Sequence, residues 1–171
     1  EAMDEKKRQR RSVDFSDIEH FALKILVDER TKECTATALE FQHQFAEILI
    51  DEYQDSNEVQ ELLLSVISKE NSESPNRFMV GDMKQSIYKF RMARPEIFLG
   101  KYERYGREHE RQTRIDLKQN FRSRQEVIDT VNHIFYPLMG REVGGICYDD
   151  DAALYAGARY PQTEVQDMMQ T

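Results

Sequence analysis

Two short apolar segments, each leading to an acidic residue, constrain the fold of this chain more than any other feature. Residues 46–50 lead into Asp51, and residues 77–82 end at Asp82. Between them, apolar residues recur at helical intervals over 59–67. A strand, a helix and a strand in this order form a right-handed unit with parallel strands. We therefore expect an α/β fold in which both acids lie at the sheet edge where open α/β sheets bind ligands.

Capping patterns and apolar spacing predict the other elements of the chain. A polar, Thr-rich connection is expected before residue 46. The remaining expectations are a helix opened by a Ser16/Glu19 capping box, a helix opened by Asn57 with Gln60, a helix with Pro95 in its first turn, a strand at 114–117, a helix opened by a Ser123/Glu126 capping box, and loops from Gly140 onward.

Composition and charge narrow the class of protein. The 171 residues are 33% charged and 39% hydrophobic, which is typical of a globular chain with a core. Cys34 and Cys147 stand far apart, which argues against a disulfide scaffold or a zinc ribbon. No apolar run can span a bilayer and no leader pattern is present, so we expect a cytoplasmic protein without membrane contact. The net charge of −8 argues weakly against a free-standing nucleic-acid module, and the opening Glu-Ala-Met predicts an excised fragment.

The first segment with residues suited to catalysis is the acidic end of the first strand. Asp51 and Glu52 follow the apolar run Ile48-Leu49-Ile50 directly. Phosphoryl transfer needs one acid to hold Mg²⁺, usually through water, and one to orient or deprotonate the attacking water. By itself the segment is equally compatible with two acids turned to solvent.

The second segment, 80–91, follows the next predicted strand and brings Gln85, Tyr88, Phe90 and Arg91 to the same sheet edge. A glutamine amide can hydrogen-bond both a terminal phosphate and a polarised water. Aromatic residues interleaved with cations suit single-stranded nucleic acid, whose bases stack and whose phosphates pair with positive charge. The alternative for Tyr88 and Phe90 is a place in the core.

The third segment, 117–124, places Phe121 and Arg122 just before a predicted helix. An arginine in this position can neutralise charge on a transferred phosphoryl group.

In their order and spacing, the three segments resemble motifs II, III and IV of the UvrD/Rep/PcrA-type superfamily-one DNA helicases. The wider sequence is similar to the AddA (RexA) subunit of bacterial AddAB helicase-nucleases, from about Asp14 to Pro161. The stretches that carry this similarity are VDFSDIEH, GDMKQSIYKFRMARPEIF, NFRSRQEV and YAGARYP.

The resemblance implies a role for each residue of a nucleotide site. Asp51 is implied as the acid associated with Mg²⁺, and Glu52 as the residue that activates water. Gln85 is implied to sense the γ-phosphate and to couple it to DNA. Phe121 takes the place of an aromatic residue that stacks on adenine, and Arg122 the place of the arginine at the γ-phosphate. The implied cofactors are ATP and Mg²⁺.

The resemblance also implies a DNA-binding segment and partners. Tyr88, Phe90 and Arg91 fall where relatives contact the single strand, although Phe90 replaces a frequent tryptophan and Met92 a glycine. The implied activity is ATP-driven translocation on single-stranded DNA and unwinding in double-strand-break repair and recombination. The implied partners are single-stranded DNA, duplex ends and an AddB-type (RexB) protein in a heterodimer.

The implied fold is a partial RecA-like P-loop NTPase core of parallel strands flanked by helices. Residues 1–110 correspond to the C-terminal part of the first motor domain, with motifs II and III. Residues 111–171 correspond to the start of the second, with motif IV and the following loops, so the boundary is expected at 106–114. The Walker A pattern G-x-x-x-x-G-K-[ST] does not occur in the 171 residues. We therefore expect this chain alone neither to hydrolyse ATP nor to unwind DNA.

Two alternatives belong to other functional classes. Asp51 followed by Asp82-Met83-Lys84 imitates an acid and a D-x-K pair that grip a divalent ion, as in a metal-dependent nuclease. That hypothesis makes Lys84 indispensable for DNA cleavage, whereas the helicase hypothesis makes Gln85 essential for ATP coupling. The second alternative is a partner-binding piece that has lost catalysis.

Overall fold

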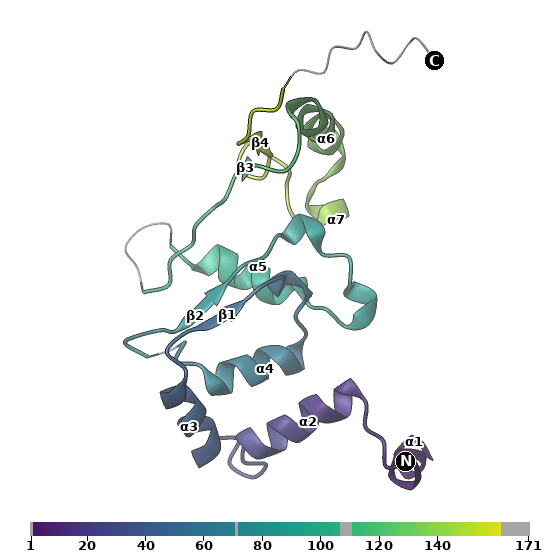
Figure 1. Ribbon diagram of the computed structural model, residues 1–171, viewed down its shortest axis with the longest axis vertical. Helices are drawn as coiled ribbons and strands as arrows, with labels where there is room; N and C mark the ends of the chain where they lie inside the picture. The colour runs from purple at the N-terminus through teal and green to yellow at the C-terminus, as the bar shows by residue number, and fades with distance from the viewer. Residues whose placement is uncertain (1, 71, 107–110, 162–171) are drawn as a thin grey trace. The chain divides into compact units, whose positions relative to one another are not determined.

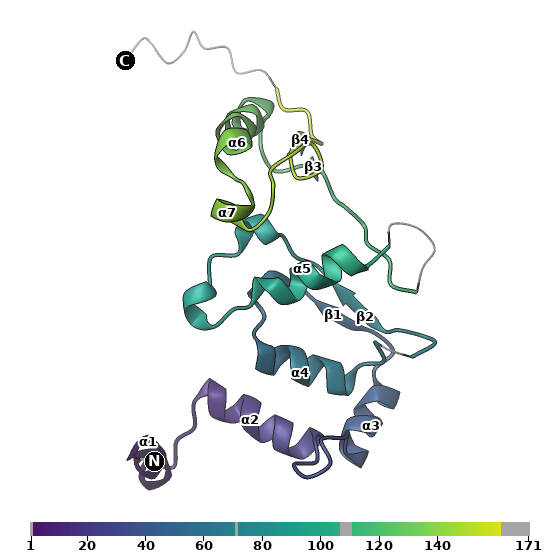
Figure 2. The same ribbon diagram turned by 180° about the vertical axis from the view of Figure 1, so that it is seen from behind.

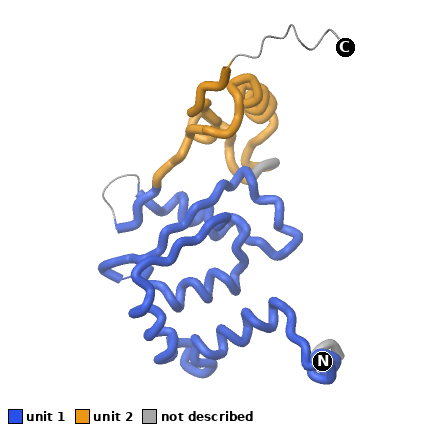
Figure 3. The backbone as a smooth tube through the Cα atoms, in the orientation of Figure 1, with its two compact units in different colours: residues 1–114 blue, residues 115–171 orange. Residues whose placement is uncertain are grey.

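The computed structural model of the chain describes residues 2–70, 72–106 and 111–161 (Figure 1). The chain divides into two compact units, Glu1–Arg114 and Ile115–Thr171 (Figure 3). Within the described ranges, no helix has the length and apolar content needed to cross a membrane.

A strand–helix–strand unit forms the centre of the first unit. It consists of β1 (Ile48–Ile50), α4 (Glu58–Ile67) and β2 (Arg77–Met79). The strands run parallel, with Leu49 opposite Phe78. Their pairing extends beyond β2, because the Val80 N–H donates to the Ile50 carbonyl at 2.8 Å. The expected α/β arrangement is therefore confirmed, and the residues after both strands share one edge.

Helix α4 begins at the residue that the sequence indicates. Asn57 is the N-cap, and its side chain accepts from the Gln60 N–H at 2.8 Å. The Gln60 side-chain oxygen in turn accepts from the Asn57 N–H at 3.3 Å, which completes the expected capping box. The apolar face of α4 packs through Val66 against Leu26 and Ala38, and the three residues form one buried apolar cluster.

In the described residues before β1, the helices are α1 (Ala2–Arg10), α2 (Phe15–Leu26) and α3 (Ala36–Gln44). The predicted Ser16/Glu19 capping box is wrong. Asp14 caps α2 instead, in a reciprocal pair with Asp17, and Ser16 lies inside the first turn. Helix α3 occupies the expected Thr-rich connection, because Thr35 accepts from the Ala38 N–H and starts a helix there.

Short 3-10 turns and one further helix surround the sheet edge. The turns are η1 (Tyr53–Asp55), η2 (Met83–Gln85) and η3 (Lys89–Arg91), and the helix is α5 (Pro95–Arg104), with Pro95 in its first turn as expected. Helices α4 and α5 lie on different sides of the two strands (Figures 1 and 2). Helix α5 packs against η1, where Phe98 meets the ring of Tyr53 edge-on at 5.8 Å between centroids.

A buried ion-pair cluster joins β2 to α4 and α5. The Arg77 side chain is only 1% exposed, and its guanidinium donates to the Glu61 carboxylate at 2.8 Å. It also donates to the Tyr53 hydroxyl at 3.0 Å, and that hydroxyl donates in turn to Glu61. We call the whole set the Arg77 cluster; its members are Tyr53, Glu61, Glu70, Arg77, Lys101 and Tyr105.

The second unit contains β3 (Gln119–Asn120), α6 (Gln125–Leu138), α7 (Arg141–Gly144) and β4 (Tyr155–Ala156), and β3 pairs in parallel with β4. The strand predicted at 114–117 is wrong, since pairing begins at Gln119. The loops predicted from Gly140 onward are interrupted by α7 and β4.

The predicted Ser123/Glu126 capping box is also wrong. Arg124 is the N-cap of α6, and it makes no capping hydrogen bond through its side chain. The Asn120 carboxamide oxygen instead accepts from the N–H groups of Arg122 and Ser123, at 2.9 and 2.8 Å. This turn is stabilised before the helix starts, so Ser123 is not needed as a cap.

Candidate functional site

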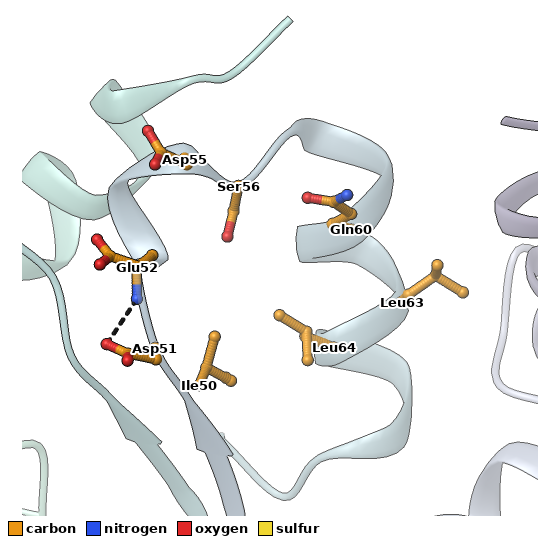
Figure 4. A pocket seen from close by; sticks show the side chains of 8 residues that line it. All are labelled: Ile50, Asp51, Glu52, Asp55, Ser56, Gln60, Leu63 and Leu64. Atoms are coloured by element: carbon orange, nitrogen blue, oxygen red, sulfur yellow. Dashed lines mark hydrogen bonds between the residues drawn. The ribbon is translucent and has the colours of Figure 1, made fainter. Parts of the chain in front are cut away.

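Two adjacent acids lie at the C-terminal end of β1 (Figure 4). The Glu52 N–H donates to the Asp51 carboxylate at 2.9 Å. Glu52 adopts a left-handed backbone conformation, with φ 49° and ψ 40°. Such a conformation costs a non-glycine residue about 1–3 kcal/mol and is concentrated at functional sites. The surrounding structure therefore holds Glu52 in a strained position directly after the strand.

An open pocket of about 410 Å³ lies between these acids and α4 (Figure 4). Asp51 and Glu52 flank it on the strand side, and Leu64 on the helix side. The full lining consists of Ile50, Asp51, Glu52, Asp55, Ser56, Gln60, Leu63 and Leu64. Burial, and after it the charge of Glu52, raises the pKa of Asp55. The pocket thus combines an apolar wall with a concentration of negative charge.

Gln54 connects the two strand ends, and sequence reasoning missed it. Its Nε2 donates to the Glu52 carboxylate at 2.7 Å, and its Oε1 accepts from the Asp82 N–H at 3.0 Å. The side chain is completely buried. The one local signal was Gly81 at the end of the second strand. A Cβ at that position would lie 2.7 Å from the Gln54 Oε1, so the backbone approaches Gln54 as closely as only glycine permits.

The segment after β2 is organised around the Asp82 carboxylate. The Lys84 ammonium lies 2.9 Å from the Asp82 carboxylate, and the Gln85 Nε2 donates to the same carboxylate at 3.1 Å. Burial by itself raises the pKa of Asp82. The hydrogen bonds from Lys84 and Gln85 together lower it by more, so the net shift of the pKa is downward. Asp82 is therefore ionised at neutral pH and holds the Gln85 side chain at the sheet edge that also carries Glu52.

The residues present fit a magnesium ion that is bound largely through water. In the described ranges, no three His, Cys, Asp or Glu side chains converge as a complete protein cage. Mg²⁺ usually keeps several waters and uses one or two carboxylates together with substrate phosphates. The exposed Asp51 carboxylate offers one such ligand.

An exposed aromatic surface follows the Asp82 segment. Phe90 is 76% exposed, and its ring lies 6.0 Å from that of Tyr88. The Arg91 guanidinium lies over both rings, at 5.3 Å from Tyr88 and 5.7 Å from Phe90. A place for Phe90 in the core of this unit is therefore wrong, and the three side chains form one surface of aromatic faces and positive charge.

In the second unit, Phe121 and Arg122 line one open pocket of about 620 Å³, together with Gln119, Asn120, Leu154 and Tyr160. The Tyr160 hydroxyl donates to the Phe121 carbonyl at 3.0 Å. The Phe121 ring lies against Gly157, where a Cβ would come within 2.6 Å of it. Phe121 and Arg122 therefore line the same pocket. Their roles, like those of Asp51, Glu52 and Gln85, remain predictions.

Comparison with known proteins identifies the family. Residues 1–106 match the family described as the UvrD/REP helicase N-terminal domain. The chain is 55% identical over 164 residues to the A subunit of the ATP-dependent helicase/nuclease of Lachnoclostridium phytofermentans, covering 95% of this chain and 12% of that protein. It is 53% identical over 155 residues to the protein of the same name from Staphylococcus haemolyticus, covering 90% of this chain and 13% of that protein.

A third relative, the protein of this name from Clostridium botulinum, is 47% identical over 165 residues, which are 95% of this chain and 13% of that protein. The chain thus spans about an eighth of the length of the curated relatives that it matches. The family match covers more than half of its residues and includes β1, β2 and the acids that follow them. The chain therefore belongs to the UvrD/REP helicase N-terminal domain family.

Proposed function

We propose that this chain is part of the A subunit of an ATP-dependent helicase/nuclease. In the whole protein, ATP hydrolysis drives translocation on single-stranded DNA and unwinding during double-strand-break repair and recombination. The single observation that best supports the proposal is the junction of the two strand ends, where Gln54 links Glu52 to Asp82 and Asp82 holds Gln85. Acids and an amide at one sheet edge are the groups that nucleotide hydrolysis requires.

In this proposal the site residues divide the steps of nucleotide binding and hydrolysis among them. Asp51 would hold Mg²⁺, and the ion would supply charge neutralisation at the phosphates when it is bound. Glu52 orients and deprotonates the attacking water. Gln85 exchanges its contact with Asp82 for one with the γ-phosphate. Phe121 stacks on the adenine, and Arg122 neutralises charge on the γ-phosphate.

The proposal extends to architecture and partners. Residues 1–110 are the C-terminal part of one RecA-like motor domain, and residues 111–171 begin a second. The protein acts in the cytoplasm on single-stranded DNA and duplex ends, in a heterodimer with an AddB-type protein. Because the 171 residues contain no Walker A pattern, the activity belongs to the whole protein and not to this chain alone.

The aromatic surface supports the DNA-binding part of the proposal. Bases stack on exposed aromatic side chains regardless of sequence, and phosphates pair with nearby arginines. Phe90 and Tyr88 present such rings, and Arg91 lies over both.

Phe90→Ala in the full-length protein should weaken binding to a single-stranded oligonucleotide by about 1–3 kcal/mol, because one stacking ring is lost. The measurement is the stimulation of ATP hydrolysis as a function of oligonucleotide concentration at fixed salt. The concentration for half-maximal stimulation should rise, while turnover without DNA stays unchanged. Phe15→Ala is the matched control, since Phe15 is an exposed phenylalanine at the start of α2, outside this surface. If single-stranded DNA fails to stimulate the wild-type protein, the proposed function is wrong.

A further inference from the structure

A fully buried polar side chain stands between the two candidate catalytic segments. Gln54 is 0% exposed, whereas Asp51 and Glu52 on the same segment are exposed. A primary amide buried without partners costs several kcal/mol on transfer from water, so burial of this kind is maintained only with hydrogen bonds. The partners of Gln54 therefore indicate what its burial achieves.

The two ends of the carboxamide bind two different segments. The Nε2 donates to the Glu52 carboxylate at 2.7 Å and lies 3.5 Å from the Asp55 carboxylate. The Oε1 accepts from the backbone N–H of Asp82 at 3.0 Å. The carboxamide thus fixes the direction of the Glu52 side chain relative to the backbone of the segment that carries Gln85.

Packing leaves the carboxamide little freedom to move. Gly81 brings its backbone so close that an added Cβ would lie 2.7 Å from the Gln54 Oε1 and 3.2 Å from the ring of Phe98. The strained backbone of Glu52 begins the turn that carries Gln54. A tightly packed side chain next to a strained candidate base is the arrangement expected of a group that maintains catalytic geometry.

We propose that Gln54 is a positioning residue, which aligns the Glu52 carboxylate and ties it to the Asp82 segment so that Gln85 and Glu52 respond together. The inference rests on the proposed function and specifies how that function is regulated. A hydrogen-bonded path runs from Glu52 through Gln54 to Asp82, and from the Asp82 carboxylate to the Gln85 amide at 3.1 Å. When Gln85 engages another acceptor, the change at Asp82 reaches Glu52 through one buried carboxamide.

Steady-state ATP hydrolysis by the full-length protein tests this inference, with turnover expressed per titrated ATP-binding site so that unfolded protein does not count. Gln54→Met keeps the length of the side chain and removes both the donor and the acceptor. Its kcat should fall about 10²-fold, because a small misplacement of the base has an effect of that size. The KM for ATP should stay at the wild-type value, and stimulation by single-stranded DNA should be lost.

Two glycine variants provide a matched comparison. Gly81→Ala introduces a Cβ against the Gln54 Oε1 and should lower kcat at unchanged KM. Gly100→Ala in α5 should leave both parameters unchanged, because an added Cβ there meets no atom within 4 Å.

Gln54→Glu separates positioning from mere packing. It keeps the acceptor for the Asp82 N–H but places a second carboxylate next to Glu52, with Asp55 also close by. The shape of the side chain is kept, but the donor to Glu52 is replaced by a like charge. Its kcat should therefore fall at unchanged KM, whereas a role in packing alone predicts the wild-type kcat.

The outcomes distinguish the two levels of the proposal. An inactive wild-type protein would overturn the proposed function itself. An active wild-type protein together with wild-type kcat and DNA stimulation in Gln54→Met, or wild-type kcat in Gln54→Glu, would overturn only the role of Gln54.

Discussion

Glu52→Gln in the full-length protein should reduce ATP turnover by about 10²–10⁴-fold, the usual contribution of a positioned general base. The substitution keeps the shape of the side chain and removes its basicity. The new amide oxygen can still accept from the Gln54 Nε2, which now lies 2.7 Å from the Glu52 carboxylate. Geometry should therefore persist while the chemical step fails.

Binding measurements separate this loss of chemistry from loss of the nucleotide. Affinity for a fluorescent ATP analogue should stay close to the wild-type value, because the phosphates and the adenine contact other residues in the proposed site. Glu58→Gln is a suitable control, since Glu58 is an exposed acid in the first turn of the same α4 that flanks the pocket. Equal turnover in wild type and Glu52→Gln would remove Glu52 from the mechanism.

Arg77→Met should lower the free energy of unfolding of this chain by about 3–5 kcal/mol, the range for removing one partner from a buried ion pair. The reason is the position of Arg77 between Glu61 and Glu70, with its own side chain only 1% exposed. Without the guanidinium, the two acids keep their contacts with Lys101 but lose one of the two cations that they share. Urea unfolding followed by circular dichroism measures the change.

A surface pair provides the control for this prediction. Arg94 and Glu58 form an ion pair of 2.8 Å, with side chains 51% and 68% exposed. Arg94→Met should therefore cost about 1 kcal/mol or less. Similar losses in both variants would contradict the structural importance of the Arg77 cluster.

The pH dependence of stability offers a second measurement on the Arg77 variant. Burial alone raises the pKa values of Glu61 and Glu70, but hydrogen bonds from Arg77 to Glu61 and from Lys101 to Glu70 lower them below the ordinary value of 4.5. An acid with a lowered folded-state pKa contributes its full stabilisation above the unfolded-state pKa. This contribution is lost as the pH falls through the folded-state pKa. The wild-type chain should therefore lose stability below about pH 4.5, and Arg77→Met should lose less over the same interval.

The centre of the fold was predictable because its signals are local. Residues 48–50 are a short apolar run, and Phe78 and Met79 are the apolar residues of the second strand. The Asn57/Gln60 capping box fixes the start of the helix between the strands. Parallel pairing then follows from general rules of chain connection. The acids after both strands could be placed at one edge for the same reason.

The errors arose where the structure depends on distant or competing contacts. Strand β3 consists of the polar Gln119 and Asn120, which pair with Tyr155 and Ala156 far along the chain. No local pattern indicates such a strand. At the start of α2, an Asp14/Asp17 pair performs the capping that the Ser16 spacing also permits.

Gln54 could not be recognised from the sequence for a related reason. It lies in a polar stretch, and only the approach of Gly81 and the packing of α5 against η1 bury it. Its partners, Glu52 and the Asp82 N–H, come together only when β1 and β2 pair. The residues expected to touch the nucleotide were predicted from residue type and from the resemblance to the helicase family, whereas the proposed positioning residue could be found only in the fold.

The most direct test of a nucleotide-bound magnesium ion at the end of β1 is cleavage of the full-length protein by Fe²⁺, which replaces Mg²⁺ at oxygen ligands. Fe²⁺, ascorbate and hydrogen peroxide in the presence of ATP should cut the backbone next to Asp51 and in the neighbouring segment around Asp82. Excess Mg²⁺ and Asp51→Asn should each suppress these cuts. Mg²⁺-sensitive cleavage at another part of the protein, with both segments left intact, would contradict the assignment.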